Sequence, residues 1–285
     1  MVVLAGASAL RSAGVRSVGD VGNVAALSWP AARLDVPVVA MPVGHGRVLA
    51  DLWRDAAASA GLGDPTFLLG DEQAARLVRD CVPEARVAVD RAEYRGPAGA
   101  LVDMMNSDED AAAWDSVLIC DGSALPPERA CAALLSECGG LQSGRRGAVL
   151  AGQGAEYGGL MLLDKALLGS VSALGFVDLK EQLLPSLAAA GARISSVELP
   201  YPVQTLRTLA SYLAYLRAAV PEPVIESGAA LDPAARVAGC SIVCSGARIG
   251  PEAVVIDSVI MRGAEVGAGA VVARSVVGPE SIVSR

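Results

Sequence analysis

The segment from Leu231 to Val283 repeats with a period of seventeen residues. A serine followed by two aliphatic residues occurs three times, at Ser241, Ser258 and Ser275. Aliphatic residues also recur about every six positions along the segment: Ile249, Val255, Ile260, Val266, Val272, Val277 and Val283. A helix of about 3.6 residues per turn cannot keep such a row on one face, and a simple strand alternates at every second residue.

The period predicts a parallel β-helix built from hexapeptides. Three short strands form one triangular coil, and each inward aliphatic side chain stacks on its equivalent in the next coil. Glycine and other small residues stand at the corners, where bulky side chains are excluded. The competing interpretation is an ordinary β-rich tail with accidental spacing. Because several independent positions repeat together, we expect a β-helix domain over residues 224–285.

The chain has 285 residues, which is enough for two domains. Its net charge of −8 argues against nucleic acid or an anionic membrane as the main partner, because both attract basic patches. Charged residues interrupt every apolar run well before the roughly 18 residues that a membrane span needs. The first residues lack the basic start and long apolar run of a signal peptide. We therefore expect a cytoplasmic protein.

The six cysteines form no CxxC pair, and His45 is the only histidine, so the sequence disfavours a zinc site. We expect reduced thiols that pack as small apolar side chains. His45 stands between two glycines and is expected to be a loop residue rather than a catalytic one.

Before the repeat, apolar strands alternate with amphipathic helices. Strands are predicted at 2–6, 66–69, 85–89, 116–120, 148–151, 159–163 and 194–199, and helices at 47–60, 72–81, from 100, 127–138, 165–168, 179–190 and 206–219. This order predicts an α/β domain over residues 1–220, with a mostly parallel sheet and helices on both faces. Residues 221–223, Pro-Glu-Pro, are the expected linker.

The sequence from Gly96 to Leu101 reads Gly-Pro-Ala-Gly-Ala-Leu and resembles a loop of the sugar-1-phosphate nucleotidyltransferases, Gly-Thr-Ala-Gly-Ala-Leu. The resemblance extends over nearly the whole chain. It implies an N-terminal Rossmann-like catalytic domain and a C-terminal left-handed β-helix, as in hexapeptide-repeat proteins. It also implies that Gly96, Ala98 and Gly99 lie beside a bound nucleotide, because a backbone approaches a ligand closely only where side chains are small. The alternative is a plain helix-entry turn.

Two further segments are similar to motifs of that family. Val117 to Asp121 resembles the strand that ends in a magnesium-binding Asp, which implies that Asp121 is a metal ligand. A carboxylate at the end of a buried strand suits a hard cation that bridges phosphates. The alternative is that Asp121 only begins a turn. The segment from Tyr157 to Asp164 resembles Asn-Ala-Gly-Ile-Tyr, which implies sugar contacts by Tyr157 and Gly159.

Other motifs of the family are incomplete. The glycine loop that cradles the triphosphate is reduced to Gly6 in Leu-Ala-Gly-Ala-Ser, although Gly6 still aligns as nucleotide-binding. Val38 stands where the family has a phosphate-binding lysine, and Thr205 stands where it has a second metal-binding Asp. Phosphoryl transfer depends on positioning and on the neutralisation of charge, so these losses argue against full activity.

We therefore expect a degenerate nucleotidyltransferase-like protein that binds a nucleotide or nucleotide sugar in a regulatory or assembly role, with Mg²⁺ bound weakly or not at all. It would act as a homo-oligomer or as the partner of an active paralogue. One alternative is an active sugar-1-phosphate nucleotidyltransferase that completes its metal site with Asp121 and another acid such as Glu198. A hexapeptide acyltransferase is the third interpretation, but the coils contain no histidine to serve as a general base.

Overall fold

A computed structural model of the chain describes residues 1–4, 36–90, 95–127, 129–141, 147–153 and 156–285. The described residues divide into two compact units. The first contains the N-terminal strand and the residues from Ala50 to Gln204, and the second contains residues 36–49 and those from Thr205 to Arg285. The domain boundary expected near residue 220 stays a prediction. The two units are defined by which residues lie close together, and that does not show which segments fold independently.

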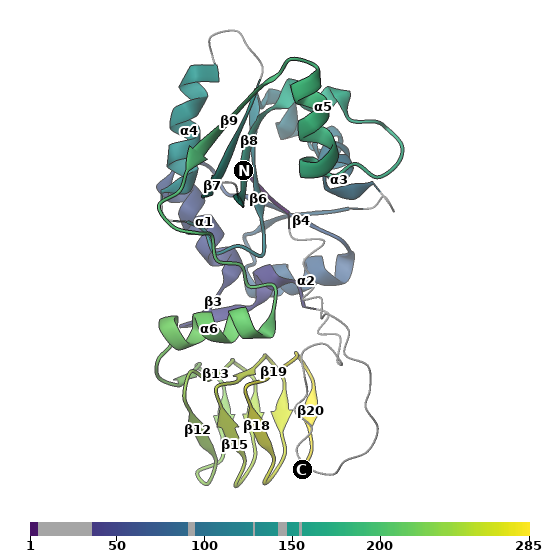
Figure 1. Ribbon diagram of the computed structural model, residues 1–285. Coiled ribbons are helices and arrows are strands. Elements are labelled where there is room, and N and C mark those ends of the chain that lie inside the picture. Colours follow the sequence, from purple (N-terminus) through teal and green to yellow (C-terminus); the bar gives the residue numbers. More distant parts are fainter. Residues whose placement is uncertain (5–35, 91–94, 128, 142–146, 154–155) are drawn as a thin grey trace, which may run out of the picture. The chain divides into compact units, whose positions relative to one another are not determined.

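The first unit is built on a seven-stranded sheet (Figure 1). Its order is β5-β4-β1-β6-β8-β7-β9. The strands are β1 (Val2–Leu4), β4 (Thr66–Leu69), β5 (Arg86–Val89), β6 (Ser116–Asp121), β7 (Gly147–Gln153), β8 (Glu156–Asp164) and β9 (Arg193–Glu198). Only β8 runs antiparallel to its neighbours, β6 and β7. The mostly parallel sheet predicted from the sequence is confirmed.

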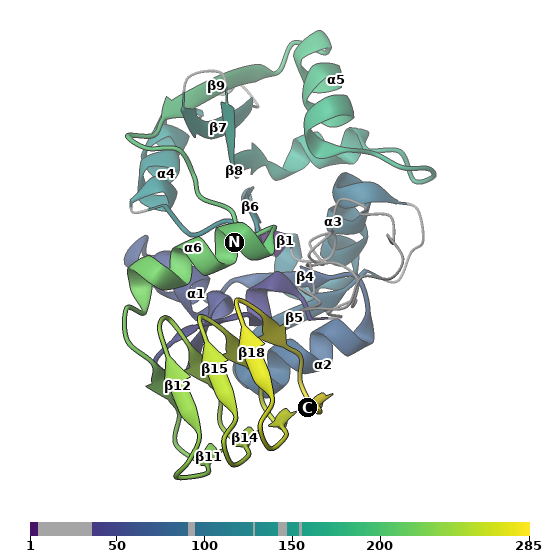
Figure 2. The same ribbon diagram turned by 60° about the horizontal axis from the view of Figure 1, so that its bottom comes forward.

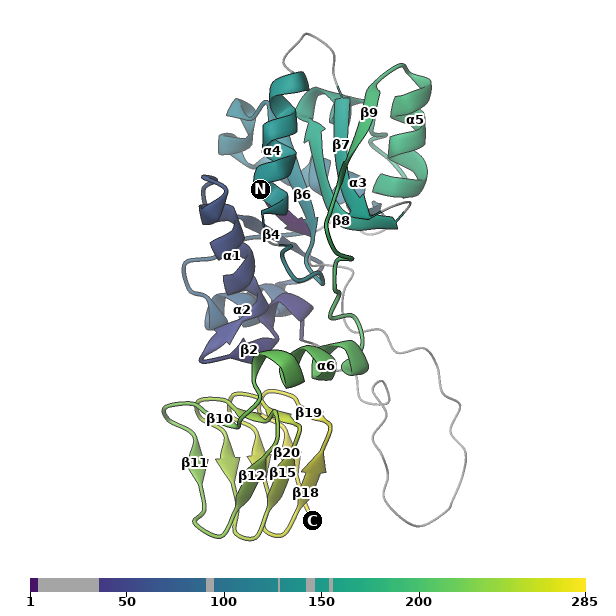
Figure 3. The same ribbon diagram turned by 60° about the vertical axis from the view of Figure 1, so that its left-hand side comes forward.

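Helices cover both faces of this sheet (Figure 3). The helical segments of the first unit are α1 (Leu49–Ser59), α2 (Glu72–Cys81), α3 (Gly96–Ser107), η2 (Glu109–Ala113), α4 (Ala130–Leu141), η3 (Lys165–Ser170), η4 (Leu179–Leu183) and α5 (Leu184–Ala189). Buried side chains of α3, η4 and α5 form one core with β6 and β8, while α4 lies on the opposite face. The helix α4 begins three residues later than its predicted start at Pro127.

The second unit contains the predicted coil stack. It has three parallel sheets: β10-β13-β16-β19, β11-β14-β17-β20 and β12-β15-β18. The strands are β10 (Val224–Ile225), β11 (Ala230–Leu231), β12 (Arg236–Ala238), β13 (Ile242–Val243), β14 (Arg248–Ile249), β15 (Val254–Ile256), β16 (Val259–Ile260), β17 (Glu265–Val266), β18 (Val271–Ala273), β19 (Val276–Val277) and β20 (Ile282–Val283). The stack fits a left-handed β-helix, and Figure 2 shows β12, β15 and β18 side by side on one of its faces.

The register confirms the repeat. Ile242 pairs with Val259, and Val259 pairs with Val276, which is a step of seventeen residues from coil to coil. The aliphatic side chains that recur about every six residues fill the interior of the coils. The repeated serines link the coils, since the Ser241 and Ser258 hydroxyls accept hydrogen bonds from the backbone N–H groups of Ser258 and Ser275.

One sheet of the β-helix is covered within the same unit. In its two-residue strands, Val243 and Ile260 face the interior, so the neighbouring Ile242 and Val259 face outward, yet both are fully buried. The helix α6 (Leu209–Ala219) lies along this face of the coils (Figures 1 and 3). Its buried Tyr212 donates a hydrogen bond of 2.6 Å to the carbonyl of Pro42, which ties α6 to the hairpin of β2 (Pro42–Gly44) and β3 (Arg47–Val48).

None of the described helices is both long and apolar enough to cross a membrane.

Candidate functional site

The candidate site lies where β1 and β6 end. Leu4 is in register with Asp121, and the N–H of Gly122 donates a hydrogen bond of 2.9 Å to the Leu4 carbonyl. Both strands therefore reach the same edge of the sheet with their carboxyl ends. Ligands of open α/β sheets bind at this edge, so Asp121 stands in the position that the sequence indicated.

The carboxylate of Asp121 is held by the turn that follows it. Its Oδ1 accepts hydrogen bonds from the N–H of Ser123 at 2.9 Å and from the Ser123 hydroxyl at 2.6 Å. Ser123 is completely buried. Sequence analysis did not single out Ser123, although an Asp followed two residues later by a small hydroxyl residue is typical of such turns. The turn fixes the direction of the carboxylate at the sheet edge.

Tyr157 and Gly159 lie beside Asp121. A Cβ on Gly159 would stand 3.0 Å from the Cβ of Asp121 and 3.9 Å from its carboxylate, so β8 lies directly against the Asp121 side chain. Burial raises the pKa of the Tyr157 phenol, and the neighbouring Cys120, Asp121 and Asp178 raise it further. The structure thus brings together the predicted metal ligand and the two predicted sugar-binding residues.

Lys180 also belongs to this group, although no sequence motif indicates it. Its Nζ lies 5.6 Å from the centre of the Tyr157 ring, a cation–π contact. Lys180 is exposed and stands in the first turn of η4, where its N–H and that of Glu181 are capped by Asp178. Lys180 therefore contacts Tyr157, which is two residues along β8 from Gly159, the neighbour of Asp121.

Gly96, Ala98 and Gly99 form the start of α3, but protein groups occupy the space next to two of them. Gly96 has φ of +70°, and a Cβ there would meet the backbone carbonyl of Val177 at 2.7 Å. The same carbonyl accepts a hydrogen bond of 3.1 Å from the N–H of Ala98. Gly96 thus packs against a neighbouring loop of the same unit.

Gly99 packs against Arg95, a residue that sequence analysis missed. A Cβ on Gly99 would lie 2.9 Å from the Cβ of Arg95 and 3.2 Å from its guanidinium carbon. Arg95 is buried and forms a bidentate ion pair with Asp103, with N–O distances of 2.9 and 3.1 Å. Its guanidinium group also donates a hydrogen bond of 2.7 Å to the carbonyl of Ser172. The small residues of this loop make room for protein contacts, which agrees with the helix-entry alternative. The nucleotide-binding role of the loop stays a prediction.

The described residues do not fit a complete magnesium site. They contain no group of three or more His, Cys, Asp or Glu side chains that could hold a metal ion. Glu198, the second acid of the active-enzyme alternative, is on β9, three strands from β6. At roughly 4.8 Å per strand, the two backbones are about 14 Å apart. Hard cations bind oxygens at roughly 2.0–2.6 Å, so a shared ion would need both side chains to reach fully toward each other.

The remaining predicted positions lie outside this group. Gly6 is outside the described residues. Val38 and Thr205 belong to the second unit, where Val38 is only 1% exposed inside the short helix η1 (Val38–Ala40) and Thr205 is half-buried. His45 is exposed with φ of +54° at the tip of the β2–β3 hairpin, as expected of a loop residue.

Two cavities of the first unit lie beside α3. One, of about 900 Å³, runs along β5, and the other, of about 1010 Å³, lies between α3, η2 and η3. Neither is lined by Asp121, Tyr157 or Lys180. The candidate site is therefore distinct from both cavities.

No protein-family model matches the sequence, and no curated protein matches it. Solved structures do share its fold. A protein of Bacillus anthracis, assigned as a glucose-1-phosphate thymidylyltransferase and solved with sucrose, is 12% identical; the match covers 76% of this chain and 94% of that one, with a TM-score of 0.56. Rv0371c of Mycobacterium tuberculosis is 13% identical over 75% of this chain and 94% of its own, with a TM-score of 0.51. At such identities the likeness establishes the fold alone, and the nucleotidyltransferase-like fold predicted from the sequence is confirmed.

Proposed function

We propose that this chain binds a nucleotide or nucleotide sugar at the carboxyl edge of β6 without transferring the nucleotidyl group efficiently. The observation that carries the proposal is that Lys180 stacks on the ring of Tyr157, two residues along β8 from Gly159, which lies against Asp121. A carboxylate accepts hydrogen bonds from sugar hydroxyls, an aromatic ring packs on a sugar or base, and an ammonium group neutralises a phosphate.

The same surroundings support binding more than catalysis. Nucleotidyl transfer requires metal ions that bridge the phosphates, together with cations and backbone amides that hold the triphosphate. Asp121 already accepts two hydrogen bonds from Ser123, and the described part of the chain offers no metal-binding cluster. Fold alone does not supply the missing groups. We therefore infer a regulatory or assembly role, as a homo-oligomer or beside an active paralogue.

The test is calorimetric titration with dTTP, dTDP-glucose and their uridine and guanosine counterparts, each with and without Mg²⁺. The name of the Bacillus anthracis neighbour makes the thymidine pair the first choice. We expect binding that changes less than about threefold when Mg²⁺ is removed. Lys180→Ala and Asp121→Asn should each weaken it at least fivefold, while Glu181→Gln, an exposed neighbour on the same turn, should not.

A pyrophosphate-exchange assay with the same nucleotides and sugar 1-phosphates separates this proposal from an active enzyme. We expect no exchange above the level of a heat-denatured control. Robust exchange that Asp121→Asn and Glu198→Gln both abolish would establish the active nucleotidyltransferase instead. Absence of any nucleotide or nucleotide-sugar binding would refute the proposed ligand class.

A further inference from the structure

Strand β5 is an edge of the seven-stranded sheet, with β4 as its one neighbour in the described part of the sheet. The N–H of Asp90 donates to the carbonyl of Leu69 at 2.7 Å, so Asp90 directs its main-chain N–H toward β4. Main-chain groups of a strand point to alternate sides, and Ala88 therefore also faces β4. The N–H and C=O groups of Val87 and Val89 point to the opposite side, the open side, which no strand of the described residues occupies and where a further strand can pair with them.

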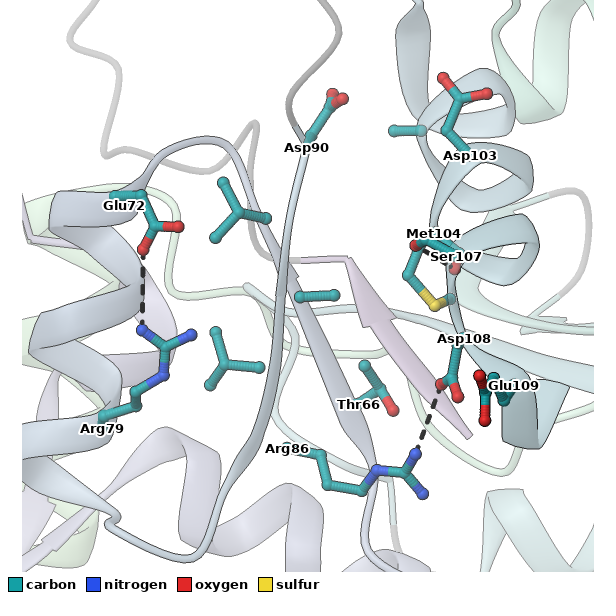
Figure 4. Close-up of a pocket in the computed structure, with 14 residues that line it drawn as sticks. Thr66, Glu72, Arg79, Arg86, Asp90, Asp103, Met104, Ser107, Asp108 and Glu109 are labelled. Carbon is teal, nitrogen blue, oxygen red and sulfur yellow. Dashed lines mark hydrogen bonds and ion pairs between the residues drawn. The ribbon is translucent and has the colours of Figure 1, made fainter.

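A groove of about 900 Å³ follows this open side. Figure 4 shows Glu72 and Arg79 of α2 on one side of β5, and Asp103, Ser107 and Asp108 of α3 and its end on the other. Val87, Ala88 and Val89 are half-buried at its floor. A groove with a strand edge at its floor and a helix on each side has the shape that accepts an extended peptide.

The charged residues that line the groove indicate the charge of the ligand that it would bind. Five carboxylates line it, those of Glu72, Asp90, Asp103, Asp108 and Glu109. Two guanidinium groups, Arg79 and Arg86, oppose them, and Arg95 beside the groove pairs with Asp103, so these charges sum to −2 at neutral pH. The arginines are engaged within the protein, since Arg79 pairs with Glu72 at 3.7 Å and Arg86 with Asp108 at 3.3 Å. The groove therefore favours a cationic ligand.

We propose that this groove binds an extended basic segment of a partner protein, which adds to the sheet as a strand beside β5. Hydrogen bonds to Val87 and Val89 hold its backbone, and lysine or arginine side chains on alternate residues meet the acidic walls. A second copy of this chain is disfavoured as occupant, because pairing two β5 edges would bring two negative groove linings together.

The probe is an acetylated and amidated heptapeptide of alternating lysine and valine. Its binding is followed by calorimetry, and the exchange of individual amides is followed by NMR. We expect the N–H groups of Val87 and Val89 to exchange at least tenfold more slowly in the complex. Those of Ala88 and Asp90 should change little, because β4 already accepts their hydrogen bonds. A peptide of alternating lysine and proline keeps the charge but lacks half of the N–H donors, and it should bind at least fivefold more weakly.

Variants locate the site. Val87→Pro removes an N–H that points away from β4, a change that an edge strand tolerates, and it should weaken peptide binding at least tenfold. Glu109→Lys in the groove should weaken binding at least threefold, whereas Glu198→Lys on the opposite edge strand, β9, should not. If Val87→Pro does not fold, Glu109→Lys and the amide exchange of the unaltered protein still decide the question.

Three outcomes would overturn the proposal. The first is equal binding of the two peptides without protection of Val87 and Val89, which would indicate charge attraction alone. The second is no binding of either peptide at millimolar concentration and low salt. The third is protection of Val87 and Val89 in the protein alone that increases with its concentration, which would make a second copy the occupant.

Discussion

Gly159 and Asp121 stand so close that a methyl group on Gly159 would lie 3.0 Å from the Cβ of Asp121. Gly159 also has φ of +80°, a region that residues with a side chain rarely adopt. Two independent constraints thus demand glycine at this point of β8. They also mean that the direction of the Asp121 carboxylate depends on a residue of the neighbouring strand.

Gly159→Ala is therefore expected to destabilise the protein by about 2 kcal/mol, from backbone strain and the close contact together. It should also weaken nucleotide binding more than the loss of stability explains, because Asp121 must move. Urea unfolding and calorimetry measure the two effects. Gly169→Ala is the matched control, since the added methyl group would meet nothing within 4 Å and its backbone has no positive φ. Equal stability of the two variants would contradict the packing described for β8.

The β-helix offers a second test. Val259 is fully buried on the outer side of its sheet, on the side that α6 crosses. Val259→Asp should cost at least about 3 kcal/mol, because an unpaired carboxylate would be buried. Val271→Asp, two strands further on in the same coil but 68% exposed, should stay within about 0.5 kcal/mol of the original protein. Thermal unfolding compares them, and similar midpoints for the two variants would show that the sheet is not covered in solution.

The sequence predicted the coils well because their information is local and repeated. Every seventeen residues the same positions recur, and each coil satisfies the same steric rule. By contrast, no periodic pattern predicts that α6 lies along the sheet β10-β13-β16-β19, because that arrangement joins segments of different pattern. Val259 shares its repeat position with Ile242 and Val276, which predicts a side chain inside the coils or tightly against them, and its burial on the outer face agrees with the second of these.

The candidate site was predicted only in part. Asp121, Tyr157 and Gly159 were found through strand ends and resemblance, and the structure brings them together. Lys180 and Arg95 were missed, because each acts through a contact distant in sequence: Lys180 with Tyr157, and Arg95 with the carbonyl of Ser172. Such contacts depend on how loops close over the sheet, and a single sequence carries no pattern for that.

Tyr212 predicts a response to alkaline pH. Burial raises the pKa of its phenol, and the nearby Cys244, Tyr215 and Cys240 raise it further. Above the ordinary tyrosine pKa, near 10, the unfolded chain loses this proton while the folded chain keeps it. The neutral phenol therefore makes its full contribution to the free energy of unfolding below about pH 10. That contribution is lost as the pH rises toward the raised pKa of the folded state.

Tyr212→Phe tests this linkage. At pH 8 the variant should be less stable by about 1–2 kcal/mol, because the Pro42 carbonyl loses its hydrogen bond. Between pH 10 and 11, the stability of the original protein should fall more steeply than that of the variant, by up to about 1.4 kcal/mol per pH unit for one proton. Parallel slopes in urea unfolding would contradict the assignment. Tyr201→Phe, an exposed tyrosine, serves as the control.

The last prediction concerns self-association through the β-helix. The outer face of the sheet β12-β15-β18 exposes Ile256 and Val271, at 39% and 68%, next to Ala238 and Ala273, and it carries one charged residue, Arg236, among the outward positions of its strands. The sheet β11-β14-β17-β20 instead carries an ion pair on its outer face, between Arg248 and Glu265 at 3.4 Å. An apolar outer face is the better surface for a second copy.

We therefore expect the protein to sediment as an oligomer at micromolar concentration, and the double variant Ile256→Glu, Val271→Glu to sediment as a monomer. Both positions are exposed, so the substitutions should leave the melting temperature within about 2 °C. Ile282→Glu, equally exposed but on the sheet with the ion pair, should keep the original mass. A monomeric original protein, or an unchanged mass of the double variant, would exclude this face as the interface, and a loss of mass in Ile282→Glu alone would move the interface to the other sheet.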